Sequence, residues 1–244
     1  MIRSYQFQLS TPQSFTAAYP LYAAMLERAP KEFAARLHES AVTPVSQYVC
    51  GDTWRVSLFG PEAIDTLAPV LETMEEVFLR REQRHIGLEL RSSGGIETVD
   101  ELLELPLRSR SALELMTPTA FKSGGVYQLL PTQRLVMQSL ILKWNGCFGD
   151  ICPIEDEGGG LEALAEGLCY RSVQLNSQLY SMKHTQIPGV VGSIAFDCRQ
   201  EGFLRQLANA LLAFGTYSGL GIKTTLGMGG LQITTKRGIP CSEC

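Results

Sequence analysis

A repeated order of strand and helix patterns constrains the fold of this chain more than any single motif. Apolar residues alternate with period two over 2–10, which predicts a strand, and take helical spacing from 11 to 39. Two strand patterns then flank Cys50-Gly51-Asp52, a sequence typical of a hairpin turn. A helix is predicted over 61–78, with proline at its first position, and a strand over 87–95. The order strand, helix, strand, strand, helix, strand is that of a ferredoxin-like domain.

The same order returns in the second half of the chain. We expect a strand at 111–121, a helix at 131–149, a long hairpin from 170 to 198, a helix at 200–215 and a last strand at 230–237. The two halves share no detectable sequence repeat. The predicted fold is therefore α+β, with two tandem ferredoxin-like (RRM-like, βαββαβ) domains that span residues 1–110 and 111–244 and a glycine-rich loop before the last strand.

The glycine-rich loop, SGLGIKTTLGMGG (218–230), follows a predicted helix and precedes a predicted strand. A dinucleotide-binding fingerprint and a P-loop both need glycines that run from a strand into a helix, so both are excluded by context. Consecutive backbone amides beside Lys223 suit a polyanion. The alternative is a turn whose glycines allow strand bulges or close packing.

Charge and composition limit the classes of function. A net charge of −4 argues against a protein that coats nucleic acid without selectivity. Residues 171–237 nevertheless hold seven Lys or Arg against two acids, which fits either a local polyanion site or a solvated face. The sequence has no apolar run long enough to cross a bilayer and no signal peptide, so we expect a cytoplasmic protein without a membrane partner.

Cysteine usage gives no support for a disulfide framework or a metal site. The seven cysteines are odd in number and widely scattered. Cys241 and Cys244 form one C-x-x-C, but a zinc knuckle needs a second pair. We expect reduced thiols and no metal.

Four segments, read together, carry a family resemblance. They are TPTAFKSGGVYQLLPTQRLVMQSLILKWN (117–145), GVVGSIAF (189–196), YSGLGIKTTLGMGGLQI (217–233) and the first helical region at 19–47. Together they resemble the Cas-six family of CRISPR-associated endoribonucleases, within the repeat-associated (RAMP) superfamily. The resemblance implies two ferredoxin-like domains and cleavage of CRISPR precursor RNA within its repeats. It also implies that no metal or cofactor is needed and that the RNA 2′-hydroxyl attacks, giving a 2′,3′-cyclic phosphate and a 5′-hydroxyl.

Such a reaction needs a base, an acid, and cations or hydrogen-bond donors that stabilise the crowded phosphorane. Histidine suits either proton role near neutral pH, and the chain has His38, His85 and His184. The resemblance places His38 as the acid or base and Tyr22 beside it, with Tyr19 as the spare. The alternatives are a helix-end histidine near the C-terminal dipole and a core tyrosine. His85 fits a solvated surface better than chemistry.

The sequence departs from the family at one position that matters for the chemistry. Some members carry a lysine six residues after the histidine, where this chain has Pro44. Phosphate stabilisation is then expected from Lys223, Arg36 or the amides of the glycine-rich loop. A hydrogen bond from Ser46 is a weaker suggestion.

The expected partner is repeat RNA, without DNA, bound by a monomer or homodimer. The predicted RNA contacts are Lys223, Gly219, Gly221, Gly227 and Gly229 of the loop, Lys183 and His184 of the long hairpin, and Arg36. One alternative is a non-catalytic RNA-binding subunit of a CRISPR effector complex, which the absent lysine favours and His38 disfavours. Another is a ferredoxin-like module that binds a small molecule or a protein, which the acidic balance favours.

Overall fold

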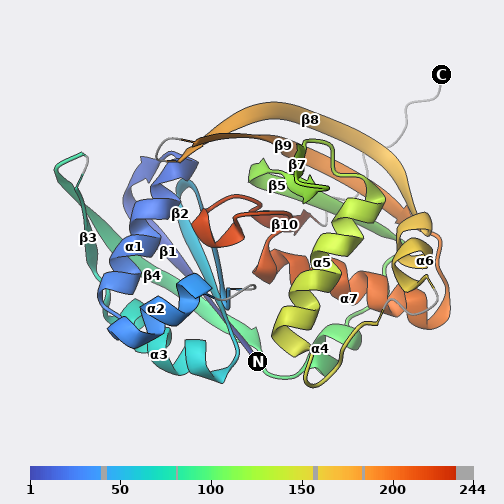
Figure 1. The fold of residues 1–244 in the computed structure, drawn as a ribbon, viewed down its shortest axis with the longest axis horizontal. Helices are drawn as coiled ribbons and strands as arrows, with labels where there is room; N and C mark the ends of the chain where they lie inside the picture. The colour runs from blue at the N-terminus through green and yellow to red at the C-terminus, as the bar shows by residue number, and fades with distance from the viewer. Residues whose placement is uncertain (40–42, 81, 156–158, 183–184, 235–244) are drawn as a thin grey trace.

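The structure is a computed structural model that describes residues 1–39, 43–80, 82–155, 159–182 and 185–234. Figure 1 shows two α+β units side by side, the N-terminal unit in blue to green and the C-terminal unit in green to red. Each unit has a four-stranded antiparallel sheet. This arrangement confirms the predicted fold class.

The N-terminal unit holds the first eight elements. They are β1 (Ile2–Gln13), the short 3₁₀ helix η1 (Phe15–Ala17), α1 (Ala18–Glu27), α2 (Lys31–Glu39), β2 (Val45–Phe59), α3 (Pro61–Thr73), β3 (Glu76–Leu79) and β4 (Arg84–Ile96). The sheet order is β2-β1-β4-β3. Alternate residues of β1 are buried, as the period-two pattern predicts.

The long strand β2 doubles back on itself as a hairpin. A straight strand of its length would separate its ends by roughly 45 Å, at about 3.3 Å per residue. Instead, the amide of Phe59 donates to the carbonyl of Pro44 at 3.0 Å, and Gly51 takes a φ of 61° between the two halves. The predicted hairpin is therefore confirmed, and β1, α1, the two halves of β2, α3 and β4 supply the βαββαβ order.

The C-terminal unit repeats that order. It contains β5 (Arg110–Thr119), β6 (Phe121–Ser123), β7 (Val126–Gln128), α5 (Gln133–Phe148), α6 (Gly160–Glu166), β8 (Leu168–Met182), β9 (Thr185–Cys198), α7 (Gly202–Ser218), the 3₁₀ turn η2 (Thr224–Leu226) and β10 (Leu231–Thr234). The sheet order β10-β5-β9-β8 places the last strand beside the first, as in the N-terminal unit.

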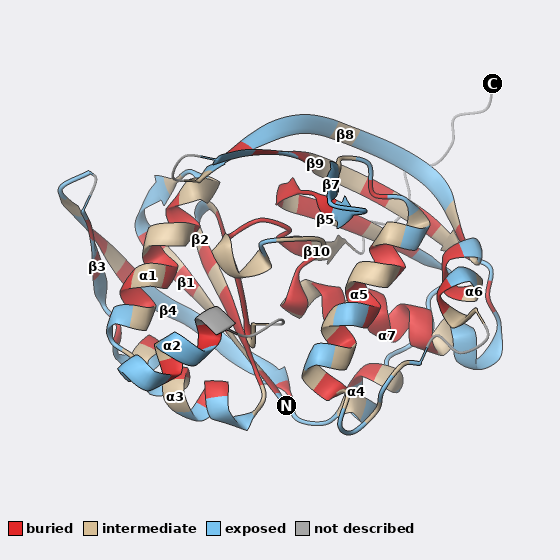
Figure 2. Ribbon diagram, in the orientation of Figure 1, coloured by how far each residue is buried: buried red, intermediate tan, exposed pale blue. Residues whose placement is uncertain are grey.

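The two units share part of their hydrophobic core. Figure 2 shows buried residues on the faces of the helices and sheets that meet inside each unit. Ile2, Phe59 and Ile96 of the first unit belong to the core of the second, and the rings of Phe59 and Phe214 lie 6.0 Å apart edge to face. The short helix α4 (Val99–Leu103) also packs on α7 through this core. The division at residue 110 stays a prediction.

Three local predictions differ from the structure. The helix predicted over 61–78 was too long, because α3 ends at Thr73 and β3 follows; Val77 and Leu79 are buried by period-two alternation against β4. The β6–β7 hairpin was missed, although Gly124-Gly125 is a turn signature and both glycines have positive φ. Helix α6 was missed because it is only seven residues long.

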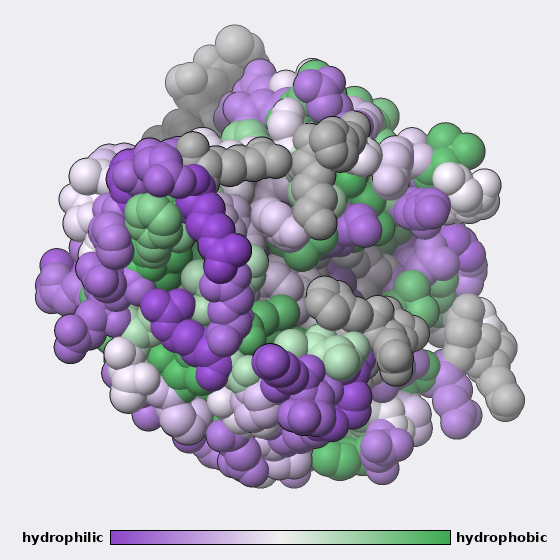
Figure 3. All heavy atoms as spheres, turned by 60° about the vertical axis from the view of Figure 1, so that its left-hand side comes forward, coloured by the Kyte–Doolittle hydropathy of each residue, from purple (hydrophilic) through white to green (hydrophobic). Residues whose placement is uncertain are grey.

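Neither the surface in Figure 3 nor the helices of the described residues show a long apolar segment. On the face in Figure 3, hydrophobic residues form small patches among hydrophilic ones. Within the described residues, no helix is both long and apolar enough to cross a membrane.

Candidate active site in the interdomain cleft

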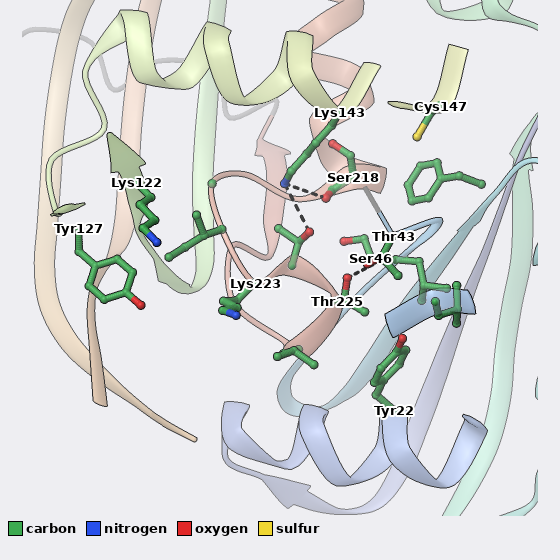
Figure 4. A pocket seen from close by; sticks show the side chains of 17 residues that line it. Tyr22, Thr43, Ser46, Lys122, Tyr127, Lys143, Cys147, Ser218, Lys223 and Thr225 are labelled. Atoms are coloured by element: carbon green, nitrogen blue, oxygen red, sulfur yellow. Dashed lines mark hydrogen bonds between the residues drawn. The ribbon is translucent and has the colours of Figure 1, made fainter. Parts of the chain in front are cut away.

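A cleft of about 560 Å³ lies between the two units, and both contribute to its walls. Figure 4 shows side chains that converge on it from α1 on one side and from α5, the β6–β7 hairpin and the glycine-rich loop on the other. Three lysines line it, Lys122, Lys143 and Lys223, and none of the described lining residues is Asp or Glu. The cleft is therefore cationic within a protein whose net charge is −4.

The N-terminal wall carries Tyr22 and Ser46, both buried. Burial raises the pKa of Tyr22 to about 12, so its hydroxyl keeps its proton at neutral pH. Leu37 of α2 also lines the cleft. His38 is the next residue along α2, and its side chain lies outside the described part of the structure. Tyr22 of the predicted pair thus lines the cleft, and the part of His38 in it stays a prediction.

Lys143 reaches the cleft from α5, opposite Tyr22 (Figure 4). Its Nζ donates to the carbonyl oxygens of Gly219 and Ser218 at 2.9 and 3.2 Å, and lies 3.4 Å from Oγ1 of Thr224. Burial of the ammonium lowers the pKa of Lys143 to about 7, while the nearby Cys147 thiol acts in the opposite direction. Lys143 fixes the start of the loop and is the most strongly perturbed cation of the site.

The lowered pKa of Lys143 predicts that stability rises with pH above neutrality. In an unfolded chain its pKa is about 10.5, so between about pH 7 and 10.5 the unfolded state binds more protons than the folded state. Because of this group, the free energy of unfolding rises by at most about 1.4 kcal/mol per pH unit in that range. Below pH 7 the group contributes no pH dependence. Urea denaturation of wild type and Lys143→Met between pH 7 and 9 should show this slope in their difference. Parallel pH dependence in the two proteins would contradict it.

The glycine-rich loop packs tightly, and most of its amides are used internally. The amides of Gly219, Gly221 and Gly229 donate to Gly215 O, Ser139 Oγ and Pro118 O, respectively. A Cβ on Gly221 would lie 2.1 Å from the carbonyl oxygen of Ala120, and one on Gly227 would lie 2.3 Å from Cβ of Ala18. The glycines therefore permit close packing. Their predicted contact with RNA stays a prediction.

Residues 221–226 of the loop, which include its 3₁₀ turn η2, line the cleft. Lys223 is exposed there, with a φ of 57°. The amides of residues 223–225 have no acceptor among the described residues. Lys223 and Gly221 are thus the predicted loop contacts that line the cleft, whereas Gly219, Gly227 and Gly229 do not.

Side chains from the N-terminal unit hold the loop in place. The buried Gln47 donates to the carbonyls of Thr225 and Ala18 and accepts from the indole of Trp54. Thr225 Oγ1 in turn donates to Val45 O at 3.0 Å. The buried Tyr180, near the tip of the β8–β9 hairpin, donates to Leu226 O. Both units thus fix the cleft wall.

The structure does not bring every predicted site residue into the cleft. Arg36 is exposed, forms an ion pair with Glu62 and does not line the cleft. His85 lies on the exposed β3–β4 hairpin, where its Nδ1 is 3.3 Å from Oε2 of Glu76. Lys183 and His184 lie outside the described residues.

Among the lining residues that were not predicted are Lys122, Tyr127 and Lys143. The first two are on the β6–β7 hairpin, which was itself missed. For Lys143 the sequence does carry a signal, since it lies seven residues after Val136 and three after Leu140, on the apolar side of the helix. A lysine at such a position is unusual unless it is paired or functional.

Within the described residues, no three His, Cys, Asp or Glu side chains are grouped so that they could hold a metal ion.

Comparisons with known proteins agree with this architecture. Residues 113–231 match the family described as CRISPR-associated endoribonuclease Cas6. The chain is 27% identical to a CRISPR-associated endoribonuclease Cas6 of Streptococcus thermophilus, over 87% of this chain and 89% of that one. A Cas6 of Mycobacterium tuberculosis is 28% identical, over 87% of this chain and 70% of that one. A solved Cas6 product complex shares the fold with a TM-score of 0.76 at 23% identity, covering 96% of this chain and 100% of that one.

The chain has the fold of the solved Cas6 structures, two ferredoxin-like units with a glycine-rich loop before the last strand. In sequence, it is similar to the Cas6 family of CRISPR-associated endoribonucleases.

Proposed function

We propose that this protein is an endoribonuclease that cuts CRISPR precursor RNA once in each repeat, in the cleft between its two domains. Relatives across most of the chain are named CRISPR-associated endoribonuclease Cas6, and two solved structures of the same fold are product complexes. The observation that supports the location best is the cleft itself, where three lysines meet without a described carboxylate. Such a cationic surface favours an anionic group such as a phosphodiester.

The proposed reaction needs no metal. The 2′-oxygen of the RNA attacks the adjacent phosphorus, the bond from phosphorus to the 5′-oxygen breaks, and the products are a 2′,3′-cyclic phosphate and a 5′-hydroxyl. A base takes the 2′-hydroxyl proton and an acid gives a proton to the leaving 5′-oxygen. His38 is proposed for one of these steps. Tyr22, protonated at neutral pH, can donate a hydrogen bond to the phosphate but is a poor base.

The test is cleavage of a transcript that carries the repeat of the neighbouring CRISPR array, with EDTA present. One cut per repeat, with a cyclic phosphate at the new 3′ end by mass spectrometry, is the expected result. Tight binding without a cut would instead favour the non-catalytic subunit of an effector complex, the alternative that Pro44 favours. No binding would exclude both RNA functions.

The two exposed lysines of the cleft, Lys122 and Lys223, should each contact a phosphate. Replacing either by glutamine should weaken RNA binding, and the slope of log affinity against log salt should fall by roughly 0.7 to 0.9 per lysine. Lys31→Gln is the matched control, because Lys31 is exposed on α2 outside the cleft lining. Filter binding at several salt concentrations measures the slope, and equal slopes for all variants would place the RNA elsewhere.

A further inference from the structure

Lys143 differs from the other two lysines of the cleft in how its ammonium is held. Lys122 and Lys223 are exposed, whereas Lys143 is half-buried and its Nζ is fixed by two carbonyl oxygens, Ser218 O and Gly219 O. These lie at the C-terminal end of α7, where unpaired carbonyls favour a donor. Lys143 therefore has a set position at the base of the cleft, while the exposed lysines can move.

The donor count at Nζ leaves one N–H without a strong acceptor. A neutral amine has two N–H donors, which satisfy the two carbonyls, and an ammonium has a third. The third acceptor in the structure, Thr224 Oγ1, lies 3.4 Å away, at the limit of a hydrogen bond. The protein thus offers two good acceptors and one poor one. The additional proton has no strong partner until something else enters the cleft.

None of the described groups that face Lys143 carries a carboxylate. The groups that line the cleft with Lys143 include Cys147 on its own helix, Lys122 and Tyr127 from β6–β7, Lys223 and Thr224 from the loop, and Tyr22 from α1; the α-amino group of Met1 acts on Cys147. Burial lowers the pKa of Lys143 to about 7 in these surroundings. At pH 8 about nine in ten of the amines are then neutral.

We propose that Lys143 binds a phosphate of the RNA at the base of the cleft and takes up a proton as the phosphate arrives. A phosphate oxygen is a stronger acceptor for the third N–H than the distant threonine hydroxyl. Its negative charge also favours the ammonium over the amine. This inference rests on the proposed function, since the phosphate belongs to the RNA. It goes further in naming the cation and in coupling binding to protonation.

Calorimetry measures that coupling directly. The probe is the repeat RNA with a 2′-deoxy nucleotide at the cut site, so that it binds without reacting. Its binding enthalpy at pH 8 is measured in HEPES and in Tris, whose ionisation enthalpies differ, and the difference gives the number of protons taken up. We expect wild type to take up about 0.9 proton more than Lys143→Arg, because arginine is already charged. Lys122→Arg is the matched control and should keep the wild-type uptake.

Lys143→Met provides a second variant if arginine disturbs the loop. It has no group to protonate, so it should show the same missing 0.9 proton, together with weaker binding at pH 6.5. Equal uptake by wild type, Lys143→Arg and Lys143→Met would overturn the inference. If wild type still cuts the unmodified repeat in that case, the proposed function stands without it. If wild type neither binds nor cuts the repeat RNA, both the role of Lys143 and the proposed function are overturned.

Discussion

Gly221→Ala should destabilise the protein by about 3 to 5 kcal/mol, among the larger effects of a single methyl group. Gly221 has a φ of 78°, and its added Cβ would meet the carbonyl oxygen of Ala120 at 2.1 Å. That carbonyl accepts the amide of Ile222 at 2.9 Å, so the loop cannot move away without losing this bond. Displacement of the loop would also move Lys223 from the cleft wall. RNA cleavage should therefore fall along with stability.

Gly124→Ala separates backbone strain from steric clash. Gly124 also has a positive φ, 56°, but a Cβ there would meet no atom within 4 Å. It should cost only about 1 to 2 kcal/mol, the penalty of a left-handed conformation for an L-residue. Urea denaturation of the two variants makes the comparison. If both lose the same stability, the glycine at 221 is required for its dihedral angles and not for close packing.

His38→Ala should reduce the rate of repeat cleavage by about 10²- to 10⁴-fold, the usual contribution of a general acid or base. RNA affinity should change little, because the lysines that line the cleft remain. A single-turnover assay with EDTA measures the rate, and filter binding measures the affinity.

His85→Ala is the control, since His85 lies on an exposed hairpin beside Glu76 and outside the cleft lining. It should leave both rate and affinity at the wild-type level. If the His38→Ala protein cuts at the wild-type rate, the protein is still an enzyme and another group transfers the proton, with Tyr22 of the cleft wall as the next candidate.

Much of the fold could be predicted because its signals are local. Period-two alternation marked β1, the turn at Gly51 marked the β2 hairpin, and the glycine-rich segment before β10 was correctly placed between a helix and a strand. Elements without such signals were missed. The segment that forms β3 continues the apolar pattern of α3, and only its pairing with β4 makes it a strand.

The site could be predicted only in part, because a cleft is a property of two domains together. Tyr22 was singled out through a family resemblance, and the structure places it in the cleft wall. Lys143 was not singled out, because its role depends on the C-terminal carbonyls of α7, about 75 residues away in sequence. The packing of the loop glycines likewise depends on Ala18 and Ala120, which only the folded chain brings near.

The most direct test of the central claim is a structure of the protein with repeat RNA that carries a 2′-deoxy nucleotide at the cut site. The account predicts that the scissile phosphate lies in the interdomain cleft, between Tyr22 of α1 and Lys143 of α5. Its predicted contacts come from both domains. A scissile phosphate bound on any other face of the protein would contradict it.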